Sequence, residues 1–312
     1  MNPGVRRAAE ILRAGGLVAF PTETVYGLGA DASSAKAVAR LYAVKGRPAD
    51  HPVIVHFANA EAAFTWANKP SPLALRLAGW FWPGPLTLIV ERSVRAKNFV
   101  TGGQDTVGLR VPSHPIAQAL LDEFGSAVAA PSANRFGAVS PTTAAHVRAD
   151  LGNEVDLVLD GGSSEVGIES TIVDVSSEEP VLLRPGHISR EQLGQALGVE
   201  ILEKSQGSPR HSGGLEKHYA PRTPARLVPT HALDKEISKL KNRVAVLAFS
   251  RPDERVDFWL RMPRDPAGYA QKLYAALREL DGAGCELILV EAPPEGAEWA
   301  AVRDRLERAS TK

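Results

Sequence analysis

The sequence predicts an α/β protein of two domains: an N-terminal twisted sheet of mixed strand direction with packed helices, and a smaller C-terminal domain. Three observations support this prediction. At 312 residues, the chain is longer than a single hydrophobic core usually supports. Its apolar fraction of 44% and charged fraction of 23% are those of an ordinary globular protein. Short apolar runs that suit buried strands are interspersed with segments of helical periodicity.

The elements of the first part follow from apolar spacing and from end signals. Residues 5–13 have helical spacing and end at Gly15-Gly16, and residues 17–20 form a short buried strand that a proline stops. The same reasoning predicts helices over 35–44, 72–81 and 114–124. It predicts strands over 52–57, 86–91, 107–111, 127–130, 157–159, 171–175 and 181–183. Because helices and strands do not strictly alternate, some antiparallel pairs are expected.

The sequence changes character at about Glu203. Residues 204–224 are interrupted by glycine and proline and lack apolar periodicity, which is typical of a linker or an active-site flap. Beyond them, two strands alternate with two helices, predicted over 243–249, 266–280, 287–290 and 299–306. We therefore expect a first domain over 1–204, a linker over 205–224 and a small Rossmann-like parallel α/β domain over 225–312.

Composition and charge exclude several classes of protein. The 36 Lys and Arg residues equal the 36 Asp and Glu residues, so the chain lacks the basic excess typical of binders that neutralise nucleic-acid phosphates. The single cysteine, Cys285, excludes an internal disulfide and a cage of thiolate metal ligands, which fits a reducing cytoplasm. No apolar run reaches the roughly 20 residues that span a bilayer. We expect a cytoplasmic protein without a membrane segment.

Polar side chains gather where predicted strands end, which is the usual place for binding sites in α/β proteins. The loop over 21–29, PTETVYGLG, brings hydroxyls, one carboxylate and two glycines behind a strand. An ordinary turn with capping threonines explains this loop equally well. The P-loop and the full dinucleotide fingerprint are missing, so any nucleotide has to be held in another way.

A basic pair follows the second predicted helix. Lys45 and Arg47 lie two residues apart in an extended stretch, so both side chains can face one anion, with Gly46 between them. An arginine fork and a lysine point charge suit a triphosphate, although two solvated charges after a helix are the commoner meaning of such a pair. His51 and His56 follow, and His56 at a strand end fits a core histidine as readily as a substrate contact.

The third cluster follows the strand predicted over 127–130. That strand stops at a proline, and Ser132 and Asn134 then add two short hydrogen-bonding side chains. Ser140 has the features of a helix N-cap, with Pro141 at the first helical position, and a helix N-terminus among hydroxyls can hold an anion. Plain capping accounts for Ser140 but leaves Ser132 and Asn134 unexplained.

Smaller signals complete the set. They are Thr106 and Arg110 at the ends of one predicted strand, Ser170 before another, Arg184 at the end of a third and Tyr219 in the glycine-rich linker. A single arginine at a strand end is usually a surface charge. Tyr219 fits either a residue that anchors the linker or a lid residue that closes over a ligand.

Together these segments resemble the YrdC-like family of threonylcarbamoyl-AMP synthases, in its long two-domain form. The matching stretches are PTETVYGLG (21–29), KGRP…HP…VH (45–56), PSAN…SPT (131–142), GIESTIVD (167–174), LLRPG (182–186) and HYAP (218–221). They follow the order of the family across the first domain, and the last one lies in the linker. The resemblance implies a YrdC-like fold for the first domain.

The resemblance also implies an activity, that of an L-threonylcarbamoyladenylate synthase. Such a nucleotidyltransferase forms threonylcarbamoyl-AMP and pyrophosphate from L-threonine, bicarbonate or CO2, and ATP. The product serves the threonylcarbamoyladenosine modification next to the tRNA anticodon, and a transferase partner protein completes that modification. Mg²⁺ is expected to arrive with ATP rather than on protein ligands, and a weak contact with tRNA is compatible with this role.

By the same resemblance the site residues fall into three groups. Catalysis and phosphate binding are assigned to Lys45, Arg47, Ser132 and Asn134. The ATP site is assigned to Arg47, His51, Thr106, Ser132, Ser140, Arg184 and Tyr219. The threonine site is assigned to Thr24, His56, Arg110, Ala130 (through its backbone) and Ser170, with Arg110 pairing with the carboxylate. Phosphoryl-type transfer needs positioning and cationic stabilisation rather than a covalent nucleophile.

The linker departs from the family pattern. Family linkers commonly read PGM-x-x-x-HYAP, whereas here Ser212 replaces the proline and Gly214 replaces the methionine. We expect Tyr219 to cover the carbamoyl-adenylate, which is prone to hydrolysis, on a linker that is looser or packs differently.

Two other interpretations are open. A double-stranded RNA or tRNA-binding module without catalysis would use a basic concave face, and the balanced charge of the chain argues against it. A carbamoyl-transfer enzyme that matures metal centres would carry zinc-finger-like segments, which one cysteine cannot supply.

Overall fold

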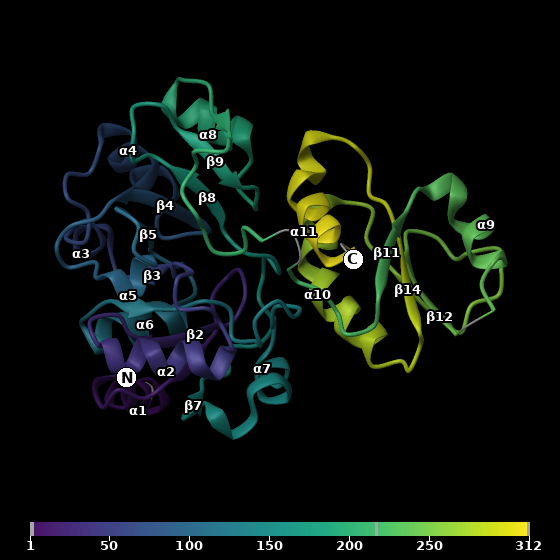
Figure 1. The fold of residues 1–312 in the computed structure, drawn as a ribbon, viewed down its shortest axis with the longest axis horizontal. Helices are drawn as coiled ribbons and strands as arrows, with labels where there is room; N and C mark the ends of the chain where they lie inside the picture. The colour runs from purple at the N-terminus through teal and green to yellow at the C-terminus, as the bar shows by residue number, and fades with distance from the viewer. Residues whose placement is uncertain (1–2, 216–217, 242, 311–312) are drawn as a thin grey trace. The chain divides into compact units, whose positions relative to one another are not determined.

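Two compact units make up the computed structural model, which describes residues 3–215, 218–241 and 243–310. The first unit contains Met1–Phe136, Pro141–Glu165 and Glu169–Gly214, and the second contains Gly137–Ser140, Val166–Ile168 and Leu215–Lys312. Each unit combines a sheet with helices (Figure 1), which confirms the predicted α/β class. The predicted domain limits at 204 and 224 stay a prediction.

The first unit is built on a ten-stranded mixed sheet with the order β10-β9-β8-β4-β5-β3-β6-β2-β1-β7. Its strands are β1 (Val18–Phe20), β2 (Gly27–Asp31), β3 (Val55–His56), β4 (Leu86–Glu91), β5 (Thr106–Arg110), β6 (Val128–Ala129), β7 (Leu157–Val158), β8 (Thr171–Asp174), β9 (Val181–Arg184) and β10 (Leu202–Glu203). Its helices are α1 (Pro3–Arg13), α2 (Ala35–Lys45), α3 (Ala60–Phe64), α4 (Pro72–Phe81), α5 (Asn98–Thr101), α6 (Pro115–Phe124), α7 (Ala144–Leu151), α8 (Arg190–Leu197) and the 3-10 turn η1 (Gly152–Glu154).

The two faces of this sheet are covered differently, because strand side chains alternate between them. One face, which includes Val55, Leu88 and Leu109, packs against α2, α4, α5, α7 and α8. On the other face, α1 and α6 cover the end near Val18 and Val128. The middle of that face carries a small apolar cluster of Ile54, Ile89, Ile172 and Leu183. We call this middle region of the sheet face the floor. The candidate site is described relative to it.

The predicted helices and strands of the first unit are present, but several strands are shorter than predicted, and β2 and β10 are strands that the sequence did not predict. The strand expected over 52–57 contains only Val55–His56, because Val53 donates its amide to the carbonyl of Val100 instead of to a neighbouring strand. Strand β2 was not predicted, because Gly27 to Gly29 were assigned to the loop expected over 21–29. A Cβ at Gly29 would lie 2.9 Å from both Phe20 and Val128, so glycine is what lets β2 enter the sheet.

The prediction that Ser140 caps a helix is wrong. Helix α7 begins at Ala144, and its N-cap is Thr143, whose side chain accepts a hydrogen bond from the amide of His146. The carbonyl of Pro141 accepts the amide of Tyr26 at 2.9 Å, which ties the preceding segment to the loop after β1 and delays the start of the helix. The N-terminus of α7 therefore lies at Thr143, three residues after Ser140.

The second unit contains a four-stranded parallel sheet with the order β11-β14-β12-β13. Its elements are β11 (Ala225–Val228), η2 (Thr230–Ala232), α9 (Leu233–Ser238), β12 (Val244–Ala248), β13 (Phe258–Arg261), α10 (Pro266–Asp281), β14 (Leu287–Glu291), η3 (Ala297–Trp299) and α11 (Ala300–Ser310). Helix α9 packs on the face of the sheet that carries Val246 of β12 and Leu289 of β14. Helices α10 and α11 lie on the other face (Figure 1). The predicted parallel domain is thus confirmed. None of the described helices is long and apolar enough to cross a membrane.

Candidate active site

Three polar side chains from adjacent strands form a row beside the floor. His56 of β3 is in register with Arg110 of β5, and Arg110 is in register with Thr87 of β4. Residues in register project to the same face of a sheet, so the three side chains are neighbours. All three are buried. The row brings together two of the predicted threonine-site residues and adds Thr87.

The basic pair lies at the end of α2 and contacts the third polar cluster. Gly46 ends the helix with a φ of 65°, a left-handed conformation that glycine adopts without strain. Lys45 is 2% exposed and donates from Nζ to the carbonyl of Ser132 at 2.5 Å and to that of Asn134 at 2.6 Å. The structure therefore brings Lys45 together with Ser132 and Asn134, which lie 87 and 89 residues later in the sequence.

The ring of Phe136 lies between Arg47 and His51. The guanidinium carbon of Arg47 is 5.5 Å from the ring centroid, and the His51 ring meets Phe136 edge-on at 5.4 Å. Arg47 also donates to the carbonyl of Pro52 at 2.7 Å. Partial burial, followed by the charge of Arg47, lowers the pKa of His51. These contacts hold the Arg47 guanidinium close to the end of α2.

Lys45 is a buried cation beside a second cation, Arg47. Burial, followed by the positive charge of Arg47, lowers the pKa of the Lys45 ammonium well below its usual value. Its ammonium donates to two backbone carbonyls, which carry only partial negative charge. A polyanion placed here would favour the charged form of the lysine. The pair is thus suited to bind phosphates.

Arg110 is bound by a carboxylate, that of Glu23, for which no role was predicted. Its Nη2 donates to Oε1 of Glu23 at 2.7 Å, and both side chains are 5% exposed. The other oxygen of Glu23 accepts the amide of Ser113 at 3.1 Å. Nε of Arg110 is buried and has no hydrogen-bond partner among the described residues. The guanidinium therefore retains a donor for a further acceptor.

His56 is a neutral imidazole at physiological pH. Burial, followed by the charge of Arg110, lowers its pKa to about 3. Its ring meets Phe20 edge-on at 6.2 Å. Its Nδ1 is buried and has no partner within the described part of the chain. A polar atom of a substrate would satisfy that nitrogen, since buried polar groups are normally hydrogen-bonded.

The other predicted threonine contacts lie in the same unit. The Thr24 hydroxyl is 2.9 Å from that of Thr22, and the amide of Ala130 already donates to the carbonyl of Ile54 at 3.0 Å. A backbone contact from Ala130 is therefore left to its carbonyl. Ser170 is completely buried, and its hydroxyl lies 2.8 Å from that of Thr87.

Arg184 links Ser170 to the linker. It donates from Nε and Nη2 to the carbonyl of Ser170, at 3.0 and 2.9 Å, and from Nη1 to the carbonyl of Ser212 at 2.8 Å. Arg184 thus joins the segment before β8 to the linker through backbone acceptors.

Linker residues lie directly over the floor. The amide of Arg210 donates to Oε1 of Gln104 at 2.7 Å, and Nε2 of Gln104 donates to the carbonyl of Arg210 at 3.0 Å. A small pocket is left between linker and sheet, and its lining includes Ile54, Ile89, Thr106 and Ser212. This places Thr106 at the rim of the floor, beneath the linker.

Ser140 and Tyr219 belong to the second unit. Tyr219 is buried with a φ of 59°, and its ring stacks on Tyr274 at 5.8 Å and lies 5.2 Å from the guanidinium of Arg305. Ser140 is also buried, and its carbonyl accepts Nε of Arg278 at 3.4 Å. Residues 216–217 of the predicted lid lie outside the described residues.

Four residues of the site region received no role from the sequence: Glu23, Thr87, Gln104 and Arg210. Thr87 gave a usable signal, since it is the polar residue within the apolar run 86–90. Glu23 lies within the PTETVYGLG loop, where the lone carboxylate was visible without an indication of its partner. Gln104 and Arg210 gave no signal, because their contact joins segments 106 residues apart.

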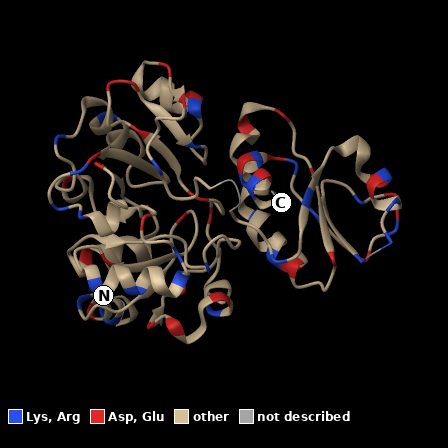
Figure 2. Ribbon diagram, in the orientation of Figure 1, with Lys and Arg blue, Asp and Glu red and all other residues tan. Residues whose placement is uncertain are grey.

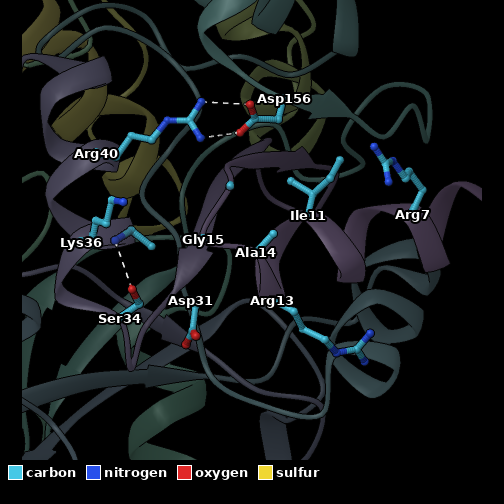
Figure 3. Close-up of a pocket in the computed structure, with 12 residues that line it drawn as sticks. Arg7, Ile11, Arg13, Ala14, Gly15, Asp31, Ser34, Lys36, Arg40 and Asp156 are labelled. Carbon is cyan, nitrogen blue, oxygen red and sulfur yellow. Dashed lines mark hydrogen bonds and ion pairs between the residues drawn. The ribbon is translucent and has the colours of Figure 1, made fainter.

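A separate hollow of about 730 Å³ lies away from these residues, between α1, α2 and the segment before β7. Figure 3 shows its side chains, with Arg40 and Asp156 joined by two hydrogen bonds of 2.7 and 2.9 Å. Arg7, Arg13 and Lys36 also line it. None of the predicted site residues does, so we do not place the active site there.

Family models decide the classification of the chain. A model of the Sua5/YciO/YrdC family, whose description is telomere recombination, matches residues 10–186. The chain belongs to this family. A second model, for the C-terminal domain of threonylcarbamoyl-AMP synthase, matches residues 188–311. The predicted resemblance to the long, two-domain form of the family is thus confirmed, and with it the prediction that the chain is an enzyme of the nucleotidyltransferase class.

Individual relatives align with nearly the full length of this chain. Proteins named threonylcarbamoyl-AMP synthase from Pyrococcus abyssi and Bacillus subtilis are 38% and 37% identical, over 98% and 99% of this chain and 94% and 93% of their own lengths. The crystal structure of P. abyssi Sua5 complexed with L-threonine has a TM-score of 0.92 and covers 98% of this chain and 94% of that one. Escherichia coli YciO, at 27% identity and a TM-score of 0.52, covers 58% of this chain and 88% of its own.

Proposed function

We propose that the chain is an L-threonylcarbamoyladenylate synthase, which converts L-threonine, bicarbonate or CO2, and ATP into threonylcarbamoyl-AMP and pyrophosphate. The observation that carries the proposal is the contact of Lys45 with the turn at Ser132 and Asn134, in the same unit as the row of His56 and Arg110. The first cluster supplies cations for a triphosphate, and the second supplies a buried arginine for a carboxylate. Full-length relatives named for this product support it.

In this proposal the phosphates of ATP lie at the end of α2. Lys45 and Arg47 neutralise them, and the side chains of Ser132 and Asn134 donate to their oxygens. His51, Thr106 and Arg184 border the rest of the nucleotide. Ser140 and Tyr219 stay predicted ATP contacts.

Threonine is proposed to occupy the row beside the floor. Arg110 binds its carboxylate, since Nε of that guanidinium still has a proton to donate. His56 offers a neutral acceptor nitrogen, and Thr24, Ser170 and the backbone of Ala130 complete the surroundings. The crystal structure of P. abyssi Sua5, whose described ligand is L-threonine, supports an amino-acid site in this fold.

The chemistry needs no covalent nucleophile on the protein. The threonine amine attacks CO2 and releases a proton, or attacks bicarbonate with loss of water, and either route gives a carbamate. A carbamate oxygen then bonds to the α-phosphorus of ATP while the bond from that phosphorus to pyrophosphate breaks, and pyrophosphate leaves. The negative charge that develops on the phosphates is stabilised by the two cations at the end of α2. Within the described ranges no three His, Cys, Asp or Glu side chains gather as a metal site. We therefore propose that Mg²⁺ is carried by the nucleotide, whose phosphates and waters suit it.

The product is proposed to serve the threonylcarbamoyladenosine modification next to the tRNA anticodon, in the cytoplasm, through a transferase partner protein. Lys and Arg are interspersed with Asp and Glu along both units in Figure 2. This distribution favours an enzyme with at most a weak tRNA contact over the alternative of an RNA-binding module. A tRNA affinity that is tight without ATP and falls steeply with salt would instead support the binder.

The proposal is tested by measuring pyrophosphate release from the full chain with ATP, Mg²⁺, bicarbonate and L-threonine. Release should require all of them, and mass spectrometry should detect threonylcarbamoyl-AMP. Omission of threonine is the matched control. Release that is equal with and without threonine, or the absence of the adenylate, would refute the proposal.

A further inference from the structure

Glu23 has a position that the proposed chemistry leaves unexplained. It lies in the loop after β1, it is buried, and it uses one oxygen on Arg110 and the other on the amide of Ser113. A buried carboxylate has a large desolvation cost and is found where a partner compensates it. Here the partner is the arginine that we propose for the carboxylate of threonine.

The loop that carries Glu23 is itself held rigidly. The hydroxyl of Thr22 donates to the carbonyl of Val25 at 2.6 Å and accepts the amides of Thr24 and Val25, each at 3.2 Å. The loop thus presents Glu23 and Thr24 from one fixed turn. Glu23 connects this turn to the end of β5, so the positions of Thr24 and Arg110 depend on one another.

Only part of the guanidinium is taken by Glu23. Nη2 of Arg110 donates to Glu23, whereas Nε is buried and has no partner among the described residues. The bond at Nη2 restricts how the guanidinium turns, and its planar fork then limits the directions of the remaining donors. The neighbouring side chain in register, His56, also has a buried ring nitrogen without a partner in the described structure. Both nitrogens belong to residues that are paired in register, and each still requires a hydrogen-bond partner.

We propose that Glu23 is a positioning residue of the threonine site: it fixes the Arg110 guanidinium so that the free donor meets the α-carboxylate of the amino acid. This inference rests on the proposed function. It predicts that Glu23 acts on the recognition of the carboxylate, through Arg110, and not on ATP binding at the end of α2.

The test compares two ligands that differ only at the carboxylate. L-Threonine and L-threoninol, in which an alcohol replaces the carboxylate, are titrated calorimetrically against the full chain without ATP. The wild type should bind threonine at least tenfold more tightly than threoninol. Glu23→Gln should reduce that ratio to below about threefold, because the arginine loses its orientation, and Glu23→Asp should give an intermediate ratio. Steady-state assays of Glu23→Gln should show a threonine KM raised at least tenfold and an ATP KM within threefold of wild type.

A matched control is available in the other sheet. Glu291 is equally buried at the end of β14, where it accepts the amide of Phe249 at 2.7 Å. Glu291→Gln should leave the ratio of the two ligand affinities unchanged, whereas a general effect of losing a buried carboxylate would alter both variants alike.

The outcomes separate the inference from the proposed function. A wild-type chain that binds neither ligand would contradict the threonine site itself. A wild type that prefers threonine, together with a Glu23→Gln variant that keeps the same preference, would overturn the positioning role while the proposed function stands. If circular dichroism shows that Glu23→Gln does not fold, Glu23→Asp decides by the same ratio, and an unchanged ratio overturns the inference.

Discussion

Unlike most lysines, Lys45 is buried, and at the end of its helix it donates to two backbone carbonyls. Lys45→Met keeps the length of the side chain but removes the charge from the proposed phosphate site. We expect threonine-dependent pyrophosphate release to fall at least a hundredfold. The two carbonyls would also lose their donor, which costs about 1–3 kcal/mol of unfolding free energy.

The control for this substitution is Lys36→Met, on the same helix but at an exposed position. It should stay within twofold of wild-type activity. A Lys45→Met variant that folds and retains more than a tenth of the wild-type rate would contradict the proposed phosphate site.

His56 makes the stability of the chain dependent on pH. Its pKa is about 3 in the folded chain but near the ordinary value of about 6.5 when unfolded. Between these values the unfolded chain takes up a proton that the folded chain does not. The stabilisation is therefore fully present above pH 6.5 and is lost as the pH falls toward 3, by up to roughly 1.4 kcal/mol per pH unit.

Urea unfolding at pH 7, 6, 5 and 4 measures this effect. His56→Asn should flatten the acid side of the stability profile relative to wild type, whereas replacement of the exposed His187 by Asn should not. Parallel profiles for wild type and His56→Asn would show that the buried histidine is not the group responsible.

At the scale of elements, the linker is held on the sheet by reciprocal hydrogen bonds between Gln104 and Arg210. Gln104→Ala removes both bonds at once. Hydrogen exchange of the Arg210 amide should become at least tenfold faster, because its acceptor is lost. Gln195→Ala, at an exposed position on α8, is the control and should change nothing there. Unchanged exchange at Arg210 would mean that the linker is held by other contacts.

The sequence predicted correctly those helices and strands whose ends are marked by local signals. Helix α4 and strand β4 have the predicted limits, since a cap or an apolar run marks both ends. Strand β2 was missed because its glycines imitate a loop, and their use becomes visible only against Phe20 and Val128. The N-cap at Ser140 was wrong because Tyr26, more than a hundred residues earlier, holds the segment beside it.

The residues of the candidate site likewise divide into those that local sequence signals indicate and those that depend on distant contacts. Lys45, Arg47, Ser132 and Asn134 are visible in the sequence as polar interruptions after regular elements, and the family resemblance groups them. The partners of Arg110 are not visible, because the contact with Glu23 spans 87 residues and depends on strand order. Sequence patterns indicate which side chains are unusual, and the fold determines which of them meet.

At the scale of the whole molecule, the two units have separate hydrophobic cores. We therefore expect that a destabilising substitution in the core of the second unit leaves the threonine site of the first unit intact. Leu289 is fully buried in the second unit, and Leu289→Ala should lower unfolding free energy by about 2–5 kcal/mol. Calorimetric unfolding should show a lowered transition for that unit, while threonine affinity stays within twofold of wild type. Leu75→Ala, at an exposed position of α4, is the control and should change stability by less than about 0.5 kcal/mol.

The bond between Lys45 and Asn134 joins residues 89 positions apart, and this separation has a consequence for the nascent chain. While the polypeptide is being synthesised, α2 leaves the ribosome long before the turn that receives its lysine exists. The early fragment therefore exposes a basic helix end without its acceptors. Nucleotide recognition begins only after the second segment has emerged and docked, so a chain truncated before residue 132 carries the motif KGRP but no phosphate pocket.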